Sequence, residues 1–155
     1  MKKLEIKKSK IDGKGVFTKN KIKKGKKVFK FANRIITIYH KEGCNCNVCC
    51  RCINVENNLW LYPYKNSFGW NLNHSCNPNC YSRSKSIYAL KKIPADAEIT
   101  IDYSTTTKDK VWNMKCSCNS IHCRKIIQSI QFIPRTLFTQ YKPYMQPFIK
   151  NSYLS

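Results

Sequence analysis

The stretch Asn73-His74-Ser75-Cys76-Asn77-Pro78-Asn79 decides the fold of this chain of 155 residues. A second segment, Glu98-Ile99-Thr100-Ile101-Asp102-Tyr103, follows it later in the sequence. Three cysteines spaced Cys-x-Cys-x4-Cys then come at Cys116, Cys118 and Cys123. Each pattern alone is a weak signal, because short motifs recur by chance. The three in this order within one small chain are a specific signal for one kind of fold.

The composition predicts one small folded domain. Hydrophobic residues make up 42% of the chain and aromatic residues 12%, enough for a modest core and too much for a disordered tail. The N-terminal stretch 1–6 is polar and no apolar segment follows it, so we expect no signal peptide. No apolar run is long enough to predict a membrane span. Ten cysteines without a secretory signal favour metal binding in a reducing intracellular compartment, either cytoplasm or nucleus.

The charge of the chain is strongly basic. It has 29 Lys and Arg against 8 Asp and Glu, a formal net charge of +21. Such a field favours acidic partners, so non-specific nucleic-acid contact through the basic surface is one expectation. Lysine outnumbers arginine heavily, however, and bidentate phosphate recognition uses arginine. The run from Lys19 to Lys30 fits a solvated hairpin edge better than a nuclear localisation patch. A zinc-stabilised nucleic-acid-binding module stays as an alternative to an enzyme.

The sequence pattern predicts a mainly β fold with short helices. Residues 4–40 are expected to form strands broken by turns, and further strands are expected at 59–64, 81–90 and 98–103. Prolines near the end of the chain keep any helices there short. Four isoleucines recur at helical spacing and are expected to close over the core: Ile126, Ile127, Ile130 and Ile133.

The cysteines predict at least one zinc site. A tetrahedral zinc takes four thiolate or imidazole ligands, and Cys116, Cys118 and Cys123 supply three from one short loop. The fourth ligand must come from elsewhere in the chain. His122 lies between two of these thiols and is expected to face solvent, and Cys80 is expected to be buried. A second cysteine cluster fits either a second metal or redox-reactive surface thiols: Cys44, Cys46, Cys49, Cys50 and Cys52.

The three motifs together resemble those of the SET-domain protein-lysine methyltransferases, with a cysteine-rich post-SET segment. The resemblance covers about residues 9–133. It implies a SET fold: small curved β-sheets around a knot-like crossing where the first two motifs meet, and a C-terminal lid stapled by zinc. It also implies a SET domain at 1–110 with a Cys-rich insertion at 43–52, a post-SET zinc segment at 111–133, and a C-terminal extension at 134–155.

The family resemblance further implies an activity and its site. The activity is N-methylation of a protein lysine by S-adenosyl-L-methionine, with a histone as the leading substrate. Tyr103 matches the catalytic tyrosine, and Tyr62 resembles the second channel tyrosine, with Tyr64 as its competitor. Cys76 matches the fourth zinc ligand beside Cys116, Cys118 and Cys123, and a second metal would use Cys44, Cys46, Cys49 and Cys52. The cofactor-binding positions are Lys14, Gly15, Val16, Phe17, Asn73, His74 and Tyr103.

Lysine methylation fits the residues of these motifs. The ε-amine must lose its proton before it attacks, yet its ordinary pKa is about 10.4, and a narrow apolar channel lowers that value by desolvation. Ile101 stands where many family members carry Phe or Tyr, and it has no hydroxyl to hold a water beside the amine. We therefore expect di- or trimethylation, unless Tyr81 reaches the same space.

The chain departs from the family pattern at two places. Asn71-Leu72 replaces the usual Arg-Phe, and Ala32-Asn33-Arg34 replaces an acidic tip. A catalytically silent SET domain that only binds a partner is the remaining alternative.

Overall fold

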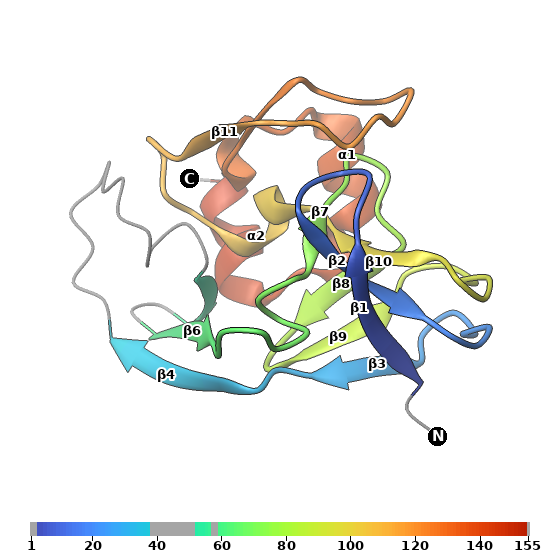
Figure 1. The fold of residues 1–155 in the computed structure, drawn as a ribbon. Coiled ribbons are helices and arrows are strands. Elements are labelled where there is room, and N and C mark those ends of the chain that lie inside the picture. The colour runs from blue at the N-terminus through green and yellow to red at the C-terminus, as the bar shows by residue number, and fades with distance from the viewer. Residues whose placement is uncertain (1–2, 38–51, 57–58, 155) are drawn as a thin grey trace.

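The computed structural model describes residues 3–37, 52–56 and 59–154. Its first sheet is built on an antiparallel hairpin of β1 (Leu4–Lys8) and β2 (Lys14–Thr18), joined by a turn in which Gly13 has a φ of 43°. A positive φ is strained for residues that have a Cβ, so this turn requires glycine. β10 (Glu98–Ile101) pairs with the other edge of β2, and β7 (Asn73–His74) pairs with β10. The strand order is therefore β1-β2-β10-β7 (Figure 1).

The two motif segments meet in this sheet, as the family resemblance predicts. β7 and β10 are parallel, with Thr100 opposite Asn73 and Ile101 opposite His74. The Asn79 side chain ties the segments further, since it accepts from the Thr100 N–H and donates to the Glu98 carbonyl. The backbone N–H of Ser75 donates to the Ile101 carbonyl at 3.0 Å. These bonds hold the end of β10 beside β7.

Two further sheets complete the β structure. One has the order β3-β9-β8, formed by Lys27–Lys30, Ser86–Ala89 and Cys80–Arg83. The other has the order β4-β6-β5, formed by Asn33–Thr37, Leu59–Pro63 and Ile53–Glu56. The single strand predicted at 81–90 is wrong in one respect, because an exposed turn divides it into the hairpin β8–β9. Ser84, at a φ of 50°, is one of the residues of that turn.

The C-terminal third contains short elements. The 3-10 helix η2 (Tyr103–Thr106) follows β10, and β11 (Asn113–Lys115) pairs with β12 (Ile126–Gln128). Then come η3 (Ile130–Phe132), α1 (Arg135–Tyr141), η4 (Lys142–Tyr144) and α2 (Pro147–Leu154). Among the described residues no helix is long and apolar enough to span a bilayer.

The helical spacing of the four isoleucines does not produce a helix. The ladder with β11 takes the backbone groups of Ile126 and Ile127, and Ile130 begins a separate 3-10 turn. Ile126 points outward with 58% of its surface exposed, whereas the other three are buried. The helical spacing is therefore not matched by a helix, and the expected burial holds for three of the four.

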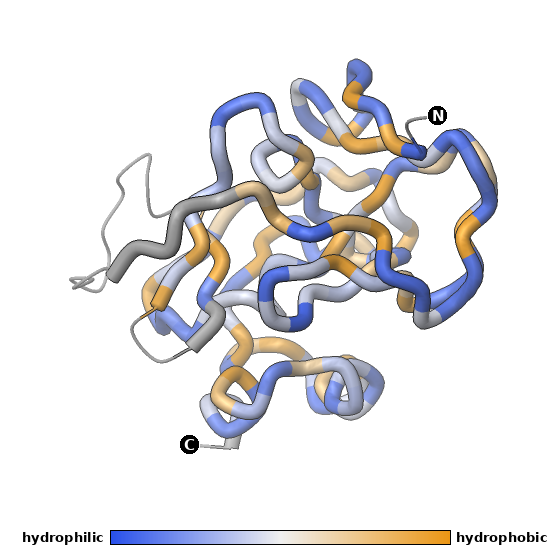
Figure 2. The backbone as a smooth tube through the Cα atoms, turned by 90° about the horizontal axis from the view of Figure 1, so that it is seen from below, coloured by the Kyte–Doolittle hydropathy of each residue, from blue (hydrophilic) through white to orange (hydrophobic). Residues whose placement is uncertain are grey.

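The core has two parts. The larger cluster lies among the sheets and includes Val16, Leu61, Leu72 and Ile101. The smaller one joins the C-terminal helices to the segment before them and contains Ile130, Ile133, Phe138, Tyr141 and Ile149. It crosses the domain boundary predicted at 133/134, so the last helices pack on the chain that precedes them. Figure 2 shows mostly hydrophilic residues in the outer loops.

Candidate functional site

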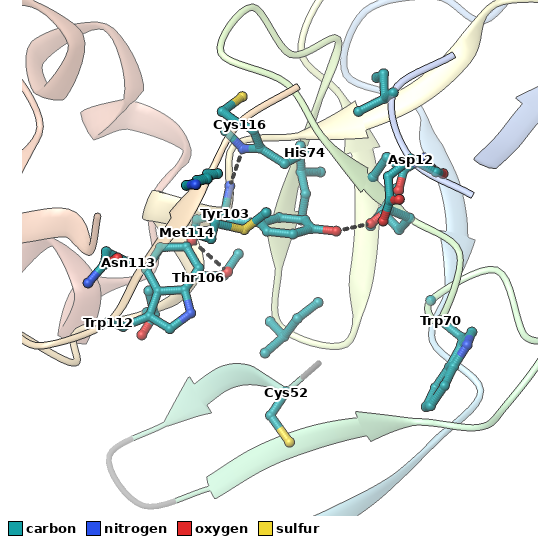
Figure 3. A pocket seen from close by; sticks show the side chains of 18 of the residues that line it. Asp12, Cys52, Trp70, His74, Tyr103, Thr106, Trp112, Asn113, Met114 and Cys116 are labelled. Carbon is teal, nitrogen blue, oxygen red and sulfur yellow. Dashed lines mark hydrogen bonds between the residues drawn. The ribbon is translucent and has the colours of Figure 1, made fainter. Parts of the chain in front are cut away.

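A cavity of about 530 Å³ opens where the N-terminal turn, β7, the end of β10 and the β11 segment come together (Figure 3). Its volume lies within the range of ligand pockets, about 300–1,000 Å³. Four of the residues predicted for catalysis, cofactor binding and methyl number line it, namely Asn73, His74, Ile101 and Tyr103, and so do the predicted metal ligands Cys52 and Cys116. All three tryptophans of the chain line it as well: Trp60, Trp70 and Trp112. The cavity therefore combines aromatic walls with a few polar groups.

Tyr103 is fixed at the centre of this cavity. Its hydroxyl donates to the Leu72 carbonyl at 2.5 Å, and its backbone N–H donates to His74 Nδ1 at 3.2 Å. The two rings meet edge to face with centroids 5.4 Å apart. Figure 3 shows the hydroxyl directed toward the side of the cavity where Asp12 lies. A phenol held at both ends presents its oxygen at one defined place.

Asn73 holds the N-terminal turn against the sheet. Its Nδ2 donates to the carbonyls of Asp12 and Lys14, both at 3.2 Å, and to Glu98 Oε1 at 2.8 Å. Ser9 Oγ donates to the same carboxylate at 2.9 Å. Ile11 and Asp12, next to this turn, line the cavity. Asn73 thus shapes the wall of the cavity through the backbone of the turn.

Gly15 is buried because Glu98 lies against its Cα. A Cβ added there would lie inside van der Waals contact of the Glu98 carboxylate. We expect Gly15→Ala to push this carboxylate away from Asn73 and to lower the free energy of unfolding by about 1–3 kcal/mol. Urea denaturation measures the change. In a Glu98→Ala background the same substitution should cost much less, and equal costs in both backgrounds would contradict the contact.

Five residues predicted for catalysis or cofactor binding lie outside the lining of the cavity. The exposed Lys14 contributes its carbonyl to Asn73, while the Val16 side chain is fully buried in the core. Phe17 is half-buried with Lys7 Nζ 5.2 Å above its ring. Tyr62 is half-buried and contacts Trp70 edge to face, with ring centroids 6.1 Å apart. Gly15 is the fifth, facing Glu98.

The predicted zinc cysteines come together beside the cavity. Cys76 Sγ lies 3.8 Å from Cys116 Sγ. That matches the edge of about 3.8 Å of a tetrahedron with Zn–S bonds near 2.3 Å. Burial alone would raise the pKa of Cys118, but hydrogen bonds from the N–H groups of Cys76 and Ser120 and with the thiols of Cys116 and Cys123 lower it to about 7. Burial raises the pKa of Cys76 and of Cys116. The four sulfurs therefore form one cluster.

His74 competes with Cys123 for the fourth position by distance alone. The ligand atoms of His74, Cys76, Cys116 and Cys118 all lie within 4.8 Å of one another. However, Nδ1 of His74 accepts a hydrogen bond from Tyr103, and burial lowers the pKa of this imidazole to about 4. In the resulting neutral tautomer Nε2 carries the proton and has no lone pair for a metal. It lies 3.3 Å from Cys76 Sγ and donates to it. Cys123 lies outside that compact group, but its thiol interacts with those of Cys116 and Cys118, so it is the remaining candidate for the fourth ligand.

The other cysteines and histidine are placed separately. His122 is exposed and Cys80 is buried, as predicted, and burial raises the pKa of Cys80 to about 12. Cys52 is buried and lines the cavity. The rest of the second cysteine cluster, Cys44, Cys46, Cys49 and Cys50, lies outside the described residues. Tyr81 is stacked with Tyr88 at 5.6 Å and lies away from the cavity lining.

Sequence reasoning missed the tryptophans and the turn residues Ile11 and Asp12. None of the three motifs contains Trp60, Trp70 or Trp112. The tryptophans themselves were the available signal for a binding site, since large aromatic side chains concentrate at such sites. Asn113 to Ser117 line the cavity as well, and only the cysteine spacing pointed to that segment.

Comparisons with known proteins agree with this geometry. The SET domain family matches residues 13–104. The histone-lysine N-methyltransferase trithorax of Drosophila virilis is 28% identical over 137 residues, which covers 77% of this chain and 3% of that protein. The variant-silencing SET domain-containing protein of Plasmodium falciparum (isolate 3D7) is 29% identical over 142 residues, covering 79% of this chain and 6% of that protein. The chain thus spans a small fraction of the length of these relatives.

Solved structures give the same fold. A crystal structure of a Plasmodium falciparum protein provisionally named a histone methyltransferase superposes with a TM-score of 0.53 at 30% identity. It covers 66% of this chain and 94% of that one. KRYPTONITE, crystallised with mCHH DNA, an H3(1-15) peptide and SAH, has a TM-score of 0.58 at 22% identity, covering 79% of this chain and 29% of that one. With the family match over more than half of its length, the chain belongs to the SET-domain family.

Proposed function

We propose that this chain is a protein-lysine N-methyltransferase that uses S-adenosyl-L-methionine. The observation that carries the proposal is the cavity itself, in which Tyr103, Asn73 and three tryptophans converge beside a cluster of four thiols. Relatives that bear the name histone-lysine N-methyltransferase support the same activity. Asn73, His74, Tyr103 and the turn around Gly15 are the proposed cofactor-binding positions, together with Lys14, Val16 and Phe17.

The cavity suits a cationic donor and a lysine. Tryptophan faces attract cations and stack on flat rings, and three of them line this space. Asp12 and Asp109 also line it, in a chain with only 8 acidic residues against 29 basic ones. They place negative charge where a sulfonium and an ammonium would bind.

The residues of the chain act by positioning and by excluding water. S-adenosyl-L-methionine, when bound, supplies a methyl group on a positively charged sulfur. The aromatic walls remove water from the incoming ε-ammonium and so lower its pKa, which favours the neutral amine. The Tyr103 hydroxyl donates its hydrogen bond to the Leu72 carbonyl. The lone pairs of the hydroxyl oxygen therefore stay available to accept from a group bound in the cavity. Tyr62 is the proposed second tyrosine, acting through its contact with Trp70.

A zinc ion held by Cys76, Cys116, Cys118 and Cys123 would fix the β11 segment. The segment runs along the cavity, and its strand β11 has only the short partner β12. A structural zinc would contribute folding free energy at this place. Reduced thiolate ligands also imply a reducing compartment. We propose the corresponding division into a SET domain, residues 1–110, a post-SET segment, 111–133, and an extension, 134–155.

Histone lysine is the leading substrate class. The direct test incubates the zinc-loaded protein with labelled S-adenosyl-L-methionine, core histones and a cell extract. Label on a discrete protein band identifies the substrate class. A folded protein that neither binds the cofactor nor transfers label would overturn the proposal and favour a binding module.

The wild-type enzyme is expected to add two or three methyl groups. Ile101 lines the cavity and has no hydroxyl to hold a water beside the amine, while Tyr81 lies away from it. Mass spectrometry of the product over a time course run to completion measures the outcome. A product that stays monomethylated with excess cofactor would contradict the role of Ile101.

A basic face on the N-terminal hairpins is the proposed nucleic-acid contact. Exposed lysines follow one another along the turn before β3 and its first residue: Lys19, Lys21, Lys23, Lys24, Lys26 and Lys27. We expect binding to duplex DNA whose affinity falls with salt. Replacing Lys23, Lys24 and Lys26 by Gln should make the slope of the logarithm of the DNA-binding constant against the logarithm of the salt concentration shallower by about 1 per lysine. The control replaces Lys110, Lys142 and Lys150, and an equal effect of both triple variants would assign the binding to overall charge alone.

A further inference from the structure

Arg124, the residue after the last cysteine of the motif, contacts two parts of the site at once. Its backbone N–H and its Nε both donate to Cys76 Sγ at 3.4 Å. Its guanidinium reaches the other way, with Nη2 2.6 Å from Asp102 Oδ1 and Nη1 3.2 Å from Ser104 Oγ. The side chain is largely buried, with 17% of its surface exposed. One planar group therefore joins the sulfur cluster to the segment after β10.

Asp102 is a buried carboxylate that depends on this contact. Only 1% of its side chain is exposed, and Oδ1 also accepts the Ser104 N–H at 3.0 Å, which caps η2. Oδ2 has no hydrogen-bond partner among the described residues, although the Tyr141 hydroxyl also lies against this carboxylate. Among the described residues, Arg124 is the only lysine or arginine within ion-pair distance of this carboxylate, and its Nη2 lies closer to Oδ1 (2.6 Å) than the His74 ring nitrogen Nδ1 does (3.6 Å). Without Arg124 the negative charge would be buried and uncompensated, which is strongly unfavourable.

The same contact controls Tyr103. Asp102 immediately precedes Tyr103, and the Tyr103 N–H is held by His74, whose Nε2 donates to Cys76. Cys76 Sγ thus receives donors from both Arg124 and His74. A metal-bound thiolate cluster carries net negative charge, and the guanidinium offsets part of it while its other edge fixes Asp102.

We propose that Arg124 is a positioning residue of the methyl-transfer site, which locks the strand end that carries Tyr103 onto the sulfur cluster. The role of Arg124 in catalysis rests on the proposed function, whereas its contacts with Cys76 and Asp102 do not depend on that function. Lysine cannot replace it fully, because a single ammonium cannot donate along both edges of a planar fork.

The test compares Arg124→Gln, Arg124→Lys, Asp102→Asn and the double variant Arg124→Gln/Asp102→Asn. Arg83→Gln is the matched control, because Arg83 is exposed and has no ion pair among the described residues. The readouts are the melting temperature, zinc content after mild chelation, the affinity for S-adenosylhomocysteine by calorimetry, and kcat and KM. Three of these do not require methyl transfer.

We expect Arg124→Gln to lower the melting temperature by about 10 °C and to lose zinc more readily. Its S-adenosylhomocysteine affinity should fall about tenfold, with kcat reduced more than KM is raised. Arg124→Lys should lie between it and wild type. The double variant should recover most of both losses, because a Gln–Asn pair leaves no buried charge and Asn still caps η2.

Two results would overturn the proposal. One is an Arg124→Gln protein that matches Arg83→Gln in cofactor affinity and zinc retention. The other is a double variant that is no better than Arg124→Gln, which would exclude charge compensation as the basis. If Arg124→Gln does not fold, Arg124→Lys and the double variant still decide between these results. A wild-type protein that transfers no methyl group contradicts only the proposed function. The melting temperature and the zinc content would still test the positioning role of Arg124.

Discussion

Replacing Tyr103 by Phe is expected to lower kcat for methyl transfer by about 100-fold, the effect seen when one fixed polar group is removed from a transition-state site. The hydroxyl that is lost donates to the Leu72 carbonyl at 2.5 Å and presents its oxygen to the cavity. The ring itself keeps its edge-to-face contact with His74, so the cavity keeps its shape. Affinity for S-adenosylhomocysteine should therefore change by less than about threefold, as for loss of one exposed polar contact.

Transfer of label to the substrate band under saturating cofactor measures the Tyr103 effect. Tyr88→Phe is the matched control, because that hydroxyl belongs to a stacked pair away from the cavity and its loss should leave kcat unchanged. A Tyr103→Phe enzyme with wild-type kcat would remove Tyr103 from the catalytic role. A variant that loses cofactor affinity and kcat together would make Tyr103 a binding residue instead.

Removal of the metal should have the second large effect. We expect one zinc at the site of Cys76, Cys116, Cys118 and Cys123. The bond network around Cys76 implies that loss of this ion disorders residues 113–128 and abolishes methyl transfer. Apparent binding free energies of about 10–16 kcal/mol are typical of four-ligand structural zinc sites, so the loss exceeds what a short β11–β12 ladder can supply. Hydrogen exchange should then rise in β11 and β12, while β2 stays protected inside its sheet.

Cys118→Ser should reproduce the effect of chelation, because it removes one of the four thiolates. Cys80→Ala removes a more deeply buried thiol that lies outside the cluster, and it should keep its zinc even though the core is weakened. Metal analysis of the purified proteins separates the two. Wild type without zinc, or Cys118→Ser with as much zinc per chain as wild type, would contradict the four-cysteine site.

The parts of the fold that the sequence predicted are those that short motifs specify. Asn73 to Asn79 and Glu98 to Tyr103 each carry several residues whose roles depend on one another, so the family and the pairing of β7 with β10 could be expected. The turn at Ser84 was missed, although the polar run Ser82–Ser86 in the middle of the predicted strand was an available turn signal. The spacing of the four isoleucines after Lys125 was misleading for a different reason. Their spacing suits a helix, but β11 supplies a partner strand that local pattern does not reveal.

The candidate site was only partly predictable for a similar reason. Tyr103, Asn73 and His74 lie within motifs, whereas Trp60, Trp70 and Trp112 come from three segments that only the folded chain brings together. The roles of Gly15 and Arg124 depend on contacts with Glu98 and Asp102, far away in the sequence. Spacing could suggest that these residues matter, but the atoms that they contact became clear only in three dimensions.

The order of strands in the first sheet also bears on how the chain is made. β2 and β7 are not neighbours until β10 lies between them, and β10 ends at Ile101. Domains form from the N-terminus as synthesis proceeds, but here the ribosome must release about two thirds of the chain before the sheet can close. The cavity waits longer still, since one of its walls lies at Trp112 to Ser117. A nascent chain stalled before Trp112 could close the sheet but would lack one wall of the pocket, so the pocket is complete only after Ser117 has left the ribosome.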